Sequence, residues 1–209
     1  MALISNEFVQ APAFIGVVAA PHLYVTDETP ADLEACENLL DKAFGAARFE
    51  KTVERLREGR LPAPGLALVA KDAGALIGTL RLWQIRAGDV PALLLGPLAV
   101  AKAYRSRGLG RRLMGDALFR AMAARHRAIL LVGDAPYYEL FGFARRHTLK
   151  LALPGPVDEK RFLGLELKNG ALKGAKGLVS PLAHVIFRCV AEHGNYAARL
   201  KRTVKKSRP

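Results

Sequence analysis

The segment from Gly96 to Met114 constrains the fold of this chain more than any other part of it. It joins a strand-like run, broken by Gly96-Pro97, to a basic loop with two glycines and then to an amphipathic helix. Proline cannot donate to a strand ladder and glycine favours a bulge, so we expect an irregular strand at this point. The glycines let a ligand approach the backbone closely, and the helix start offers unpaired N–H groups and a positive dipole end. The segment therefore predicts an anion site suited to a pyrophosphate.

Hydrophobic periodicity and turn residues place the other elements. Thr29-Pro30 is typical of a helix start, and Gly45 of a helix end. The helix after the glycine loop has one apolar stripe, made by Leu109, Leu113, Met114, Ala117 and Ala121. We expect strands at 23–25, 66–70, 76–85, 90–100, 128–132, 143–153 and 161–168, and helices at 30–44, 49–58, 108–125 and 136–141. This order predicts an α/β fold with a mixed sheet and helices packed on it.

The composition is that of a globular domain. Of the 209 residues, 51% are hydrophobic and 24% are charged. No uninterrupted apolar run approaches the roughly 20 residues that a membrane helix requires, and the apolar stretch 8–20 lacks the basic residues that begin a signal peptide. Cys36 and Cys189 fit no disulfide framework or metal pattern, and the five histidines show no ligand spacing. We therefore expect a cytoplasmic protein that binds neither a metal nor a membrane.

Positive charge is concentrated at the C-terminal end of the chain. The formal net charge is +13, and from Lys168 to Pro209 ten Lys or Arg residues stand against one acid, Glu192. We expect three parts: an N-terminal lead (1–22), one domain (23–167) and a basic extension (168–209) with one helix that opens at Ser180-Pro181. A basic extension can attract nucleic acid. We disfavour nucleic acid as a partner, because the extension offers no aromatic platform and its apolar helix face is suited to packing.

Two motifs specify the site further. The glycine loop reads Arg105-x-x-Gly108-x-Gly110, which differs from the nucleotide-binding patterns Gly-x-x-x-x-Gly-Lys-Ser/Thr and Gly-x-Gly-x-x-Gly. Downstream stands a tyrosine motif, Tyr138-x-x-x-Gly142-Phe143. In their context these motifs resemble the acyl-CoA motif and the fourth-helix tyrosine of the GNAT acetyltransferase family. The run from Gly133 to Phe143 is similar to the YhbS-like bacterial branch of that family, and the resemblance covers about residues 23 to 167.

The resemblance implies a GNAT fold, whose mostly antiparallel central sheet splays open between its fourth and fifth strands. The pantetheine arm of acetyl-CoA would lie in that gap, between residues 98–100 and 128–132, with its pyrophosphate on the loop amides. The implied coenzyme-binding residues are Leu98, Ala99, Val100, Arg105, Ser106, Arg107, Gly108, Leu109, Gly110 and Arg111. The implied reaction is direct transfer of an acetyl group to a primary amine of a small molecule or protein, with backbone N–H groups near Leu98 stabilising the oxyanion.

Tyr138 is the implied general acid that protonates the departing thiolate, with Tyr137 as the alternative. We assign no general base, because the strand at 90–100 holds no carboxylate or histidine. Three carboxylates elsewhere fit helix caps or solvated charges better than a base: Glu28, Asp134 and Glu139.

Acceptor specificity in the family comes largely from the first two helices and their loop, here Ala31 to Pro64, and this region carries no readable motif. Trp83, Arg81 and Gln84 precede the bulged strand and could face the acceptor, although a single tryptophan is more often a core residue. Two other functions stay open, a CoA-binding module without catalysis and a nucleic-acid-binding protein led by the basic extension. A homodimer stays open as well.

Overall fold

A mixed sheet runs through the protein, of which the computed structural model describes residues 22–182. Its strands are β1 (Leu23–Asp27), β2 (Ala67–Asp72), β3 (Ala75–Ala87), β4 (Val90–Val100), β5 (Ala128–Val132), β6 (Leu151–Ala152), β7 (Phe162–Glu166) and β8 (Gly177–Pro181). Among the described residues, six strands lie in the order β1-β2-β3-β4-β5-β7, and β8 pairs with both β3 and β6. The pairs β4–β5 and β6–β8 are parallel and the others are antiparallel. The predicted mixed, mostly antiparallel sheet is confirmed.

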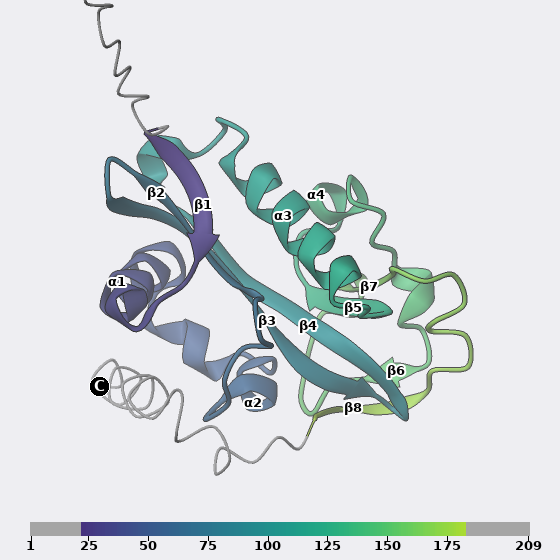
Figure 1. Cartoon of the computed structure of the whole chain (residues 1–209). Coiled ribbons are helices and arrows are strands. Elements are labelled where there is room, and N and C mark those ends of the chain that lie inside the picture. The colour runs from purple at the N-terminus through teal and green to yellow at the C-terminus, as the bar shows by residue number, and fades with distance from the viewer. Residues whose placement is uncertain (1–21, 183–209) are drawn as a thin grey trace, which may run out of the picture.

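Two pairs of helices cover opposite faces of this sheet (Figure 1). One face carries α1 (Leu33–Phe44) and α2 (Glu54–Arg57), and the other carries α3 (Leu109–Ala123) and α4 (Ala135–Glu139). Side chains of β3 alternate between the two faces, as strand geometry requires. Leu80 and Leu82 pack in the apolar cluster that includes α3, whereas Ile85 packs with Leu56 of α2. The sheet therefore separates two helical layers. A ligand can contact residues of both layers only where two strands of the sheet separate.

Local residues set the ends of the predicted helices. Thr29 is the N-cap of the 3-10 turn Pro30–Asp32 that leads into α1, and the Asp32 carboxylate fixes this start by accepting from the N–H and the hydroxyl of Thr29 at 2.9 and 2.7 Å. Gly45 ends α1 with a φ of 69°, and its N–H donates to the carbonyl oxygen of Asp41 at 2.9 Å. In α3 the buried residues are those of the predicted apolar stripe, Leu109, Leu113, Met114, Ala117 and Ala121. Both helices are confirmed.

Two predicted elements are shorter than the sequence indicates. The helix expected at 49–58 is divided into a 3-10 turn, Ala46–Glu50, and the single turn of α2. The strand expected at 143–153 holds an isolated bridge at Ala144, a 3-10 turn at Arg145–His147 and the two residues of β6. In both regions tertiary contacts, rather than local periodicity, decide the backbone conformation.

The C-terminal part of the described chain belongs to the sheet. The sequence predicts that Ser180-Pro181 opens a helix, but these residues end β8, which pairs with Ile85–Ala87 of β3. Four apolar residues ahead of and within β8 are buried in the core: Ala171, Leu172, Ala175 and Val179. The sheet therefore continues past the expected boundary at residue 167. The rest of the expected tail helix lies outside the described residues, as does the N-terminal lead up to residue 21.

Candidate active site

The sheet opens between β4 and β5. These parallel strands pair at two positions, Leu93 with Ile129 and Leu94 with Leu130. Beyond them β4 continues to Val100 along β3, and β5 continues along β7, so the two strands no longer share a ladder. Within the described chain, the β5-facing edge of this last part of β4 has no strand partner and can pair with an extended ligand. The predicted splay is confirmed.

A bulge in β4 lies at this opening. Against β3 the register shifts between Leu80 and Leu82, so that Gly96 and Pro97 together oppose the single residue Arg81. Gly96 has a φ of 116°, which residues with a Cβ rarely adopt. The predicted irregularity is therefore present, and it redirects the chain just before Leu98.

The basic glycine loop connects β4 to α3. Ser106 and Gly108 have φ values of 61° and 79°, and Gly108 is the N-cap of α3. Arg105 Nε donates to the carbonyl oxygen of Val100 at 3.1 Å and so folds the loop back onto β4. Three exposed arginines surround the first turn of the helix: Arg105, Arg107 and Arg111. The residues predicted to bind the coenzyme thus lie on two adjoining segments, the end of β4 and the start of α3, which together suit a polyanion.

The two tyrosines of α4 lie at different parts of the opening. A methyl group added to Gly110 would lie 2.9 Å from Tyr137 Oη, so Tyr137 reaches the first turn of α3. A methyl group added to Gly133 would lie 2.2 Å from the Tyr138 ring, so that ring packs directly on the end of β5. Burial raises the pKa of Tyr138 to about 12, and burial also raises the pKa of Tyr137. Both phenols therefore keep their protons at neutral pH.

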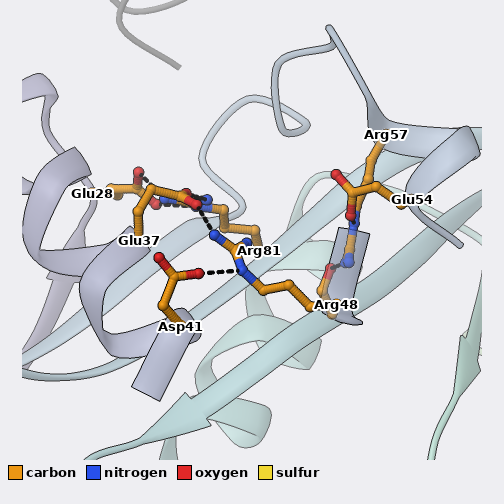
Figure 2. Close-up of polar contacts among 8 residues, drawn as sticks. Glu28, Glu37, Asp41, Arg48, Glu54, Arg57 and Arg81 are labelled. Atoms are coloured by element: carbon orange, nitrogen blue, oxygen red, sulfur yellow. Dashed lines mark hydrogen bonds and ion pairs between the residues drawn. The ribbon is translucent and has the colours of Figure 1, made fainter. Parts of the chain in front are cut away.

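A buried network of ion pairs lies on the face of the sheet that carries α1 and α2, away from the tyrosines of α4 (Figure 2). Arg81, which opposes the bulge, pairs with Glu28 at 2.6 Å and with Glu37 of α1 at 2.8 Å. Arg48 joins Glu37 to Asp41 at 2.6 and 2.8 Å. Burial alone would raise the pKa of Glu37, but the charges and hydrogen bonds of Arg81 and Arg48 hold that pKa below its usual value. These ion pairs hold α1 and the turn after it against β3.

A second ion pair contacts the bulge itself (Figure 2). Arg57 of α2 pairs with Glu54 at 2.7 Å, and its Nη1 donates to the carbonyl oxygen of Gly96 at 3.0 Å. The guanidinium carbon also lies 5.4 Å from the centroid of the Trp83 ring. Sequence reasoning missed Glu54 and Arg57, because no motif marks them. The only available signal was their place in the region from Ala31 to Pro64 that the resemblance assigns to the acceptor.

The residues expected near the acceptor lie in different places. Arg81 and Trp83 are buried on the face that carries α1 and α2. Gln84 points to the other face, where it lines a separate pocket with Arg125 and His126. Three carboxylates were weighed as general bases: Glu28 holds Arg81 through both oxygens, and Asp134 and Glu139 are exposed around α4.

Of the two cysteines, the structure describes Cys36, and Cys189 lies outside the described residues. Burial raises the pKa of the Cys36 thiol to about 12, which keeps the thiol protonated. Across residues 22–182, no three His, Cys, Asp or Glu side chains are grouped to hold a metal ion. None of the helices in that range has the length and apolar character needed to cross a membrane.

Comparison with known proteins gives a consistent result. The acetyltransferase (GNAT) family model matches residues 33–143. The chain is 32% identical over 161 residues to the protein named uncharacterized N-acetyltransferase YhbS from Escherichia coli strain K12, covering 75% of this chain and 95% of the relative.

Solved structures agree with the sequence comparison. The crystal structure of the GNAT family N-acetyltransferase YhbS from Escherichia coli in complex with CoA is 30% identical with a TM-score of 0.67, covering 79% of this chain and 92% of that one. A GNAT family acetyltransferase from Brucella melitensis, solved in complex with acetyl-CoA, is 24% identical with a TM-score of 0.59, covering 78% and 98%, and has the same fold. With its splayed sheet, its bulged fourth strand and these matches, the chain belongs to the GNAT family of acetyltransferases.

Proposed function

We propose that this enzyme binds acetyl-CoA in the opening between β4 and β5 and transfers its acetyl group to a primary amine of a small molecule or protein. The observation that carries the proposal is the splay, which leaves a strand edge beside an exposed helix start with three arginines. The pantetheine arm is an extended chain with amide groups that can pair with this edge, and a pyrophosphate suits the helix start. The CoA-bound YhbS structure supports the same kind of ligand for this chain.

Acetyl transfer is direct in this proposal. The unprotonated amine attacks the thioester carbonyl, the C–N bond forms as the C–S bond breaks, and backbone N–H groups near Leu98 stabilise the oxyanion. Tyr138 gives its phenolic proton to the departing sulfur, and the phenolate that remains takes a proton back from water. Because burial raises the pKa of Tyr138 to about 12, the phenol is protonated at neutral pH before each transfer. The amine proton passes to water. An acyl-enzyme is not invoked, because burial raises the pKa of the Cys36 thiol to about 12 and a protonated thiol is a poor nucleophile.

Calorimetric titration with acetyl-CoA, together with an assay of CoA thiol release in a panel of primary amines, tests this proposal. We expect Gly108→Val to weaken acetyl-CoA binding about tenfold or more, because a β-branched side chain at a φ of 79° distorts the loop. Gly170→Val is the matched control, since Gly170 has a φ of 75° and equally open surroundings but lies after β7.

The possible results separate the alternatives. Acetyl-CoA binding without thiol release for any amine favours the CoA-binding module without catalysis. Absence of acetyl-CoA binding by the unaltered protein overturns the proposal. The cytoplasmic location and the homodimer stay predictions, and the nucleic-acid hypothesis concerns the basic extension, most of which lies outside the described residues.

A further inference from the structure

Two positively charged side chains, Lys51 and Arg161, belong to segments that are joined on the face carrying α1 and α2. Lys51 lies just before α2, and Arg161 directly precedes β7. The hydroxyl of Thr52 donates to the carbonyl oxygen of Pro156, and Arg55 Nη1 donates to that of Pro154 at 2.6 Å. These hydrogen bonds hold the start of α2 against the loop that leads to Arg161.

Arg161 lies beside the proposed general acid. Its Nε donates to the carbonyl oxygen of Gly133 at 3.3 Å, and Gly133 is the residue on which the Tyr138 ring packs. The charge of Arg161 acts on both of its neighbours. Burial raises the pKa of Tyr138 and Arg161 opposes that rise, while burial and then the charges of Arg161 and Arg57 lower the pKa of Lys51. Arg161 thus lies at the end of β5, and Lys51 is close enough for its pKa to respond to the charge of Arg161.

The charges of these two side chains are not balanced locally. Arg57, the third cation of the group, is neutralised by Glu54 at 2.7 Å. Within residues 22–182, neither Lys51 nor Arg161 forms an ion pair, and the Lys51 ammonium instead lies 5.0 Å from the centroid of the Phe44 ring. Both side chains are exposed, so solvent screens part of their mutual repulsion, and an anion bound beside them would lower it further.

We propose that Lys51 and Arg161 bind an anionic group of the acceptor, a carboxylate or a phosphate, and thereby direct its amine toward the thioester near Tyr138. A guanidinium fork and an ammonium are well suited to either group. The inference rests on the proposed function and adds the substrate class, namely amines that carry a negative charge near the amino group. The phosphates of the coenzyme are the competing anion. They are assigned to the first turn of α3 near Tyr137, whereas Arg161 lies at Gly133 near Tyr138.

Matched acceptor pairs test this inference through catalysis. Glycine is compared with glycinamide and phosphoethanolamine with ethanolamine, and kcat/KM is expressed per unprotonated amine. We expect the anionic member of a pair to be favoured about tenfold or more, and we expect Lys51→Gln/Arg161→Gln to remove that preference. Arg86→Gln is the control, because it removes one positive charge from a partly exposed side chain at the β3–β4 turn. A larger preference within the glycine pair indicates a carboxylate subsite, and a larger preference within the phosphoethanolamine pair indicates a phosphate subsite.

Direct anion binding provides a readout that does not depend on turnover. Inorganic phosphate is titrated calorimetrically into the protein saturated with CoA, so that the proposed pyrophosphate site at the first turn of α3 is already occupied. We expect phosphate to bind the unaltered protein and Arg86→Gln equally, and to bind the double variant about tenfold more weakly. Acetyl-CoA affinity is measured on the same three proteins and should not change.

The outcomes distinguish the two proposals. If no amine is acetylated but phosphate binding depends on Lys51 and Arg161, the proposed acetyl transfer fails and the anion subsite stands. If amines are acetylated with no preference for an anion, or with a preference that the double variant retains, the subsite is wrong. Loss of acetyl-CoA affinity in the double variant also overturns it, because the two cations would then serve the coenzyme.

Discussion

The guanidinium of Arg57 donates a hydrogen bond to the carbonyl oxygen of Gly96 across 3.0 Å and thereby joins α2 to the bulge of β4. The same guanidinium is held by Glu54, so the position of the bulge depends on a helical residue 39 positions earlier in the chain. Since backbone N–H groups just after the bulge are the proposed oxyanion donors, we expect Arg57 to position these donors without itself touching the reacting atoms.

Arg57→Lys should therefore lower kcat and leave acetyl-CoA affinity almost unchanged. A lysine cannot pair with Glu54 and also reach Gly96 through a planar fork, and loss of a hydrogen bond from a charged donor costs about 1.5–3 kcal/mol, or roughly ten- to a hundredfold in kcat. Steady-state kinetics and calorimetry separate the two effects. An unchanged kcat would show that the bulge holds its shape without Arg57.

The ion pairs of Arg81 predict a large loss of stability on one substitution. Arg81→Met leaves Glu28 and Glu37 buried without their shared cation, and breaking a buried pair in this way costs about 3–5 kcal/mol. Arg86→Met is the control, since Arg86 is partly exposed and lies 3.7 Å from Asp89, a pair worth at most about 1 kcal/mol. Urea unfolding of the two variants measures both losses, and equal losses would contradict the buried network.

The lowered pKa of Glu37 predicts how stability depends on pH. The carboxylate is favoured in the folded state, so its contribution is complete above its ordinary pKa of 4.5 and disappears as pH falls through the lower folded pKa. Glu37→Gln should thus flatten the fall in the free energy of unfolding below pH 4.5. Urea titrations at several pH values in this acidic range provide the measurement, and an unaltered slope would assign the acid sensitivity to other carboxylates.

Tyr138 and Gly133 form a pair that tests the proposed acid. Tyr138→Phe should lower kcat more than it changes acetyl-CoA affinity, because the packed ring is retained while the hydroxyl that donates the proton is lost. Gly133→Ala should have a similar effect, since its new methyl group would lie 2.2 Å from the ring and force it to move. With a pKa of about 12, Tyr138 keeps its proton across the usual assay range, so kcat should show no alkaline fall from this group until pH approaches 12. Normal turnover in Tyr138→Phe would make Tyr137 the better candidate.

The parts of the fold that were predictable are those whose signals lie within a few residues. The stripe of α3 repeats at helical spacing, the caps at Thr29 and Gly45 act on adjacent N–H groups, and the bulge follows from Gly96-Pro97 itself. The opening of the sheet came from the family resemblance, and β4 and β5 diverge where it places them.

The parts that were not predictable depend on contacts between distant residues. Arg57 meets Gly96, and Thr52 meets Pro156, only after the chain has folded, and no spacing in the sequence records either contact. Glu28 has the appearance of a solvated charge in the sequence, yet it lies buried against Arg81. Ser180-Pro181 is typical of a helix start, but pairing with β3 makes it the end of a strand.

That pairing decides where the chain can be shortened. β8 pairs with the final residues of β3 and brings Val179 into the core. A protein cut after Leu167 would therefore expose an unpaired strand edge and the apolar core residues that β8 covers. Such a fragment is a candidate for aggregation, whereas a chain retained through Leu182 keeps its edge covered. We therefore expect a stable fragment to reach at least fifteen residues beyond residue 167, where the family resemblance ends.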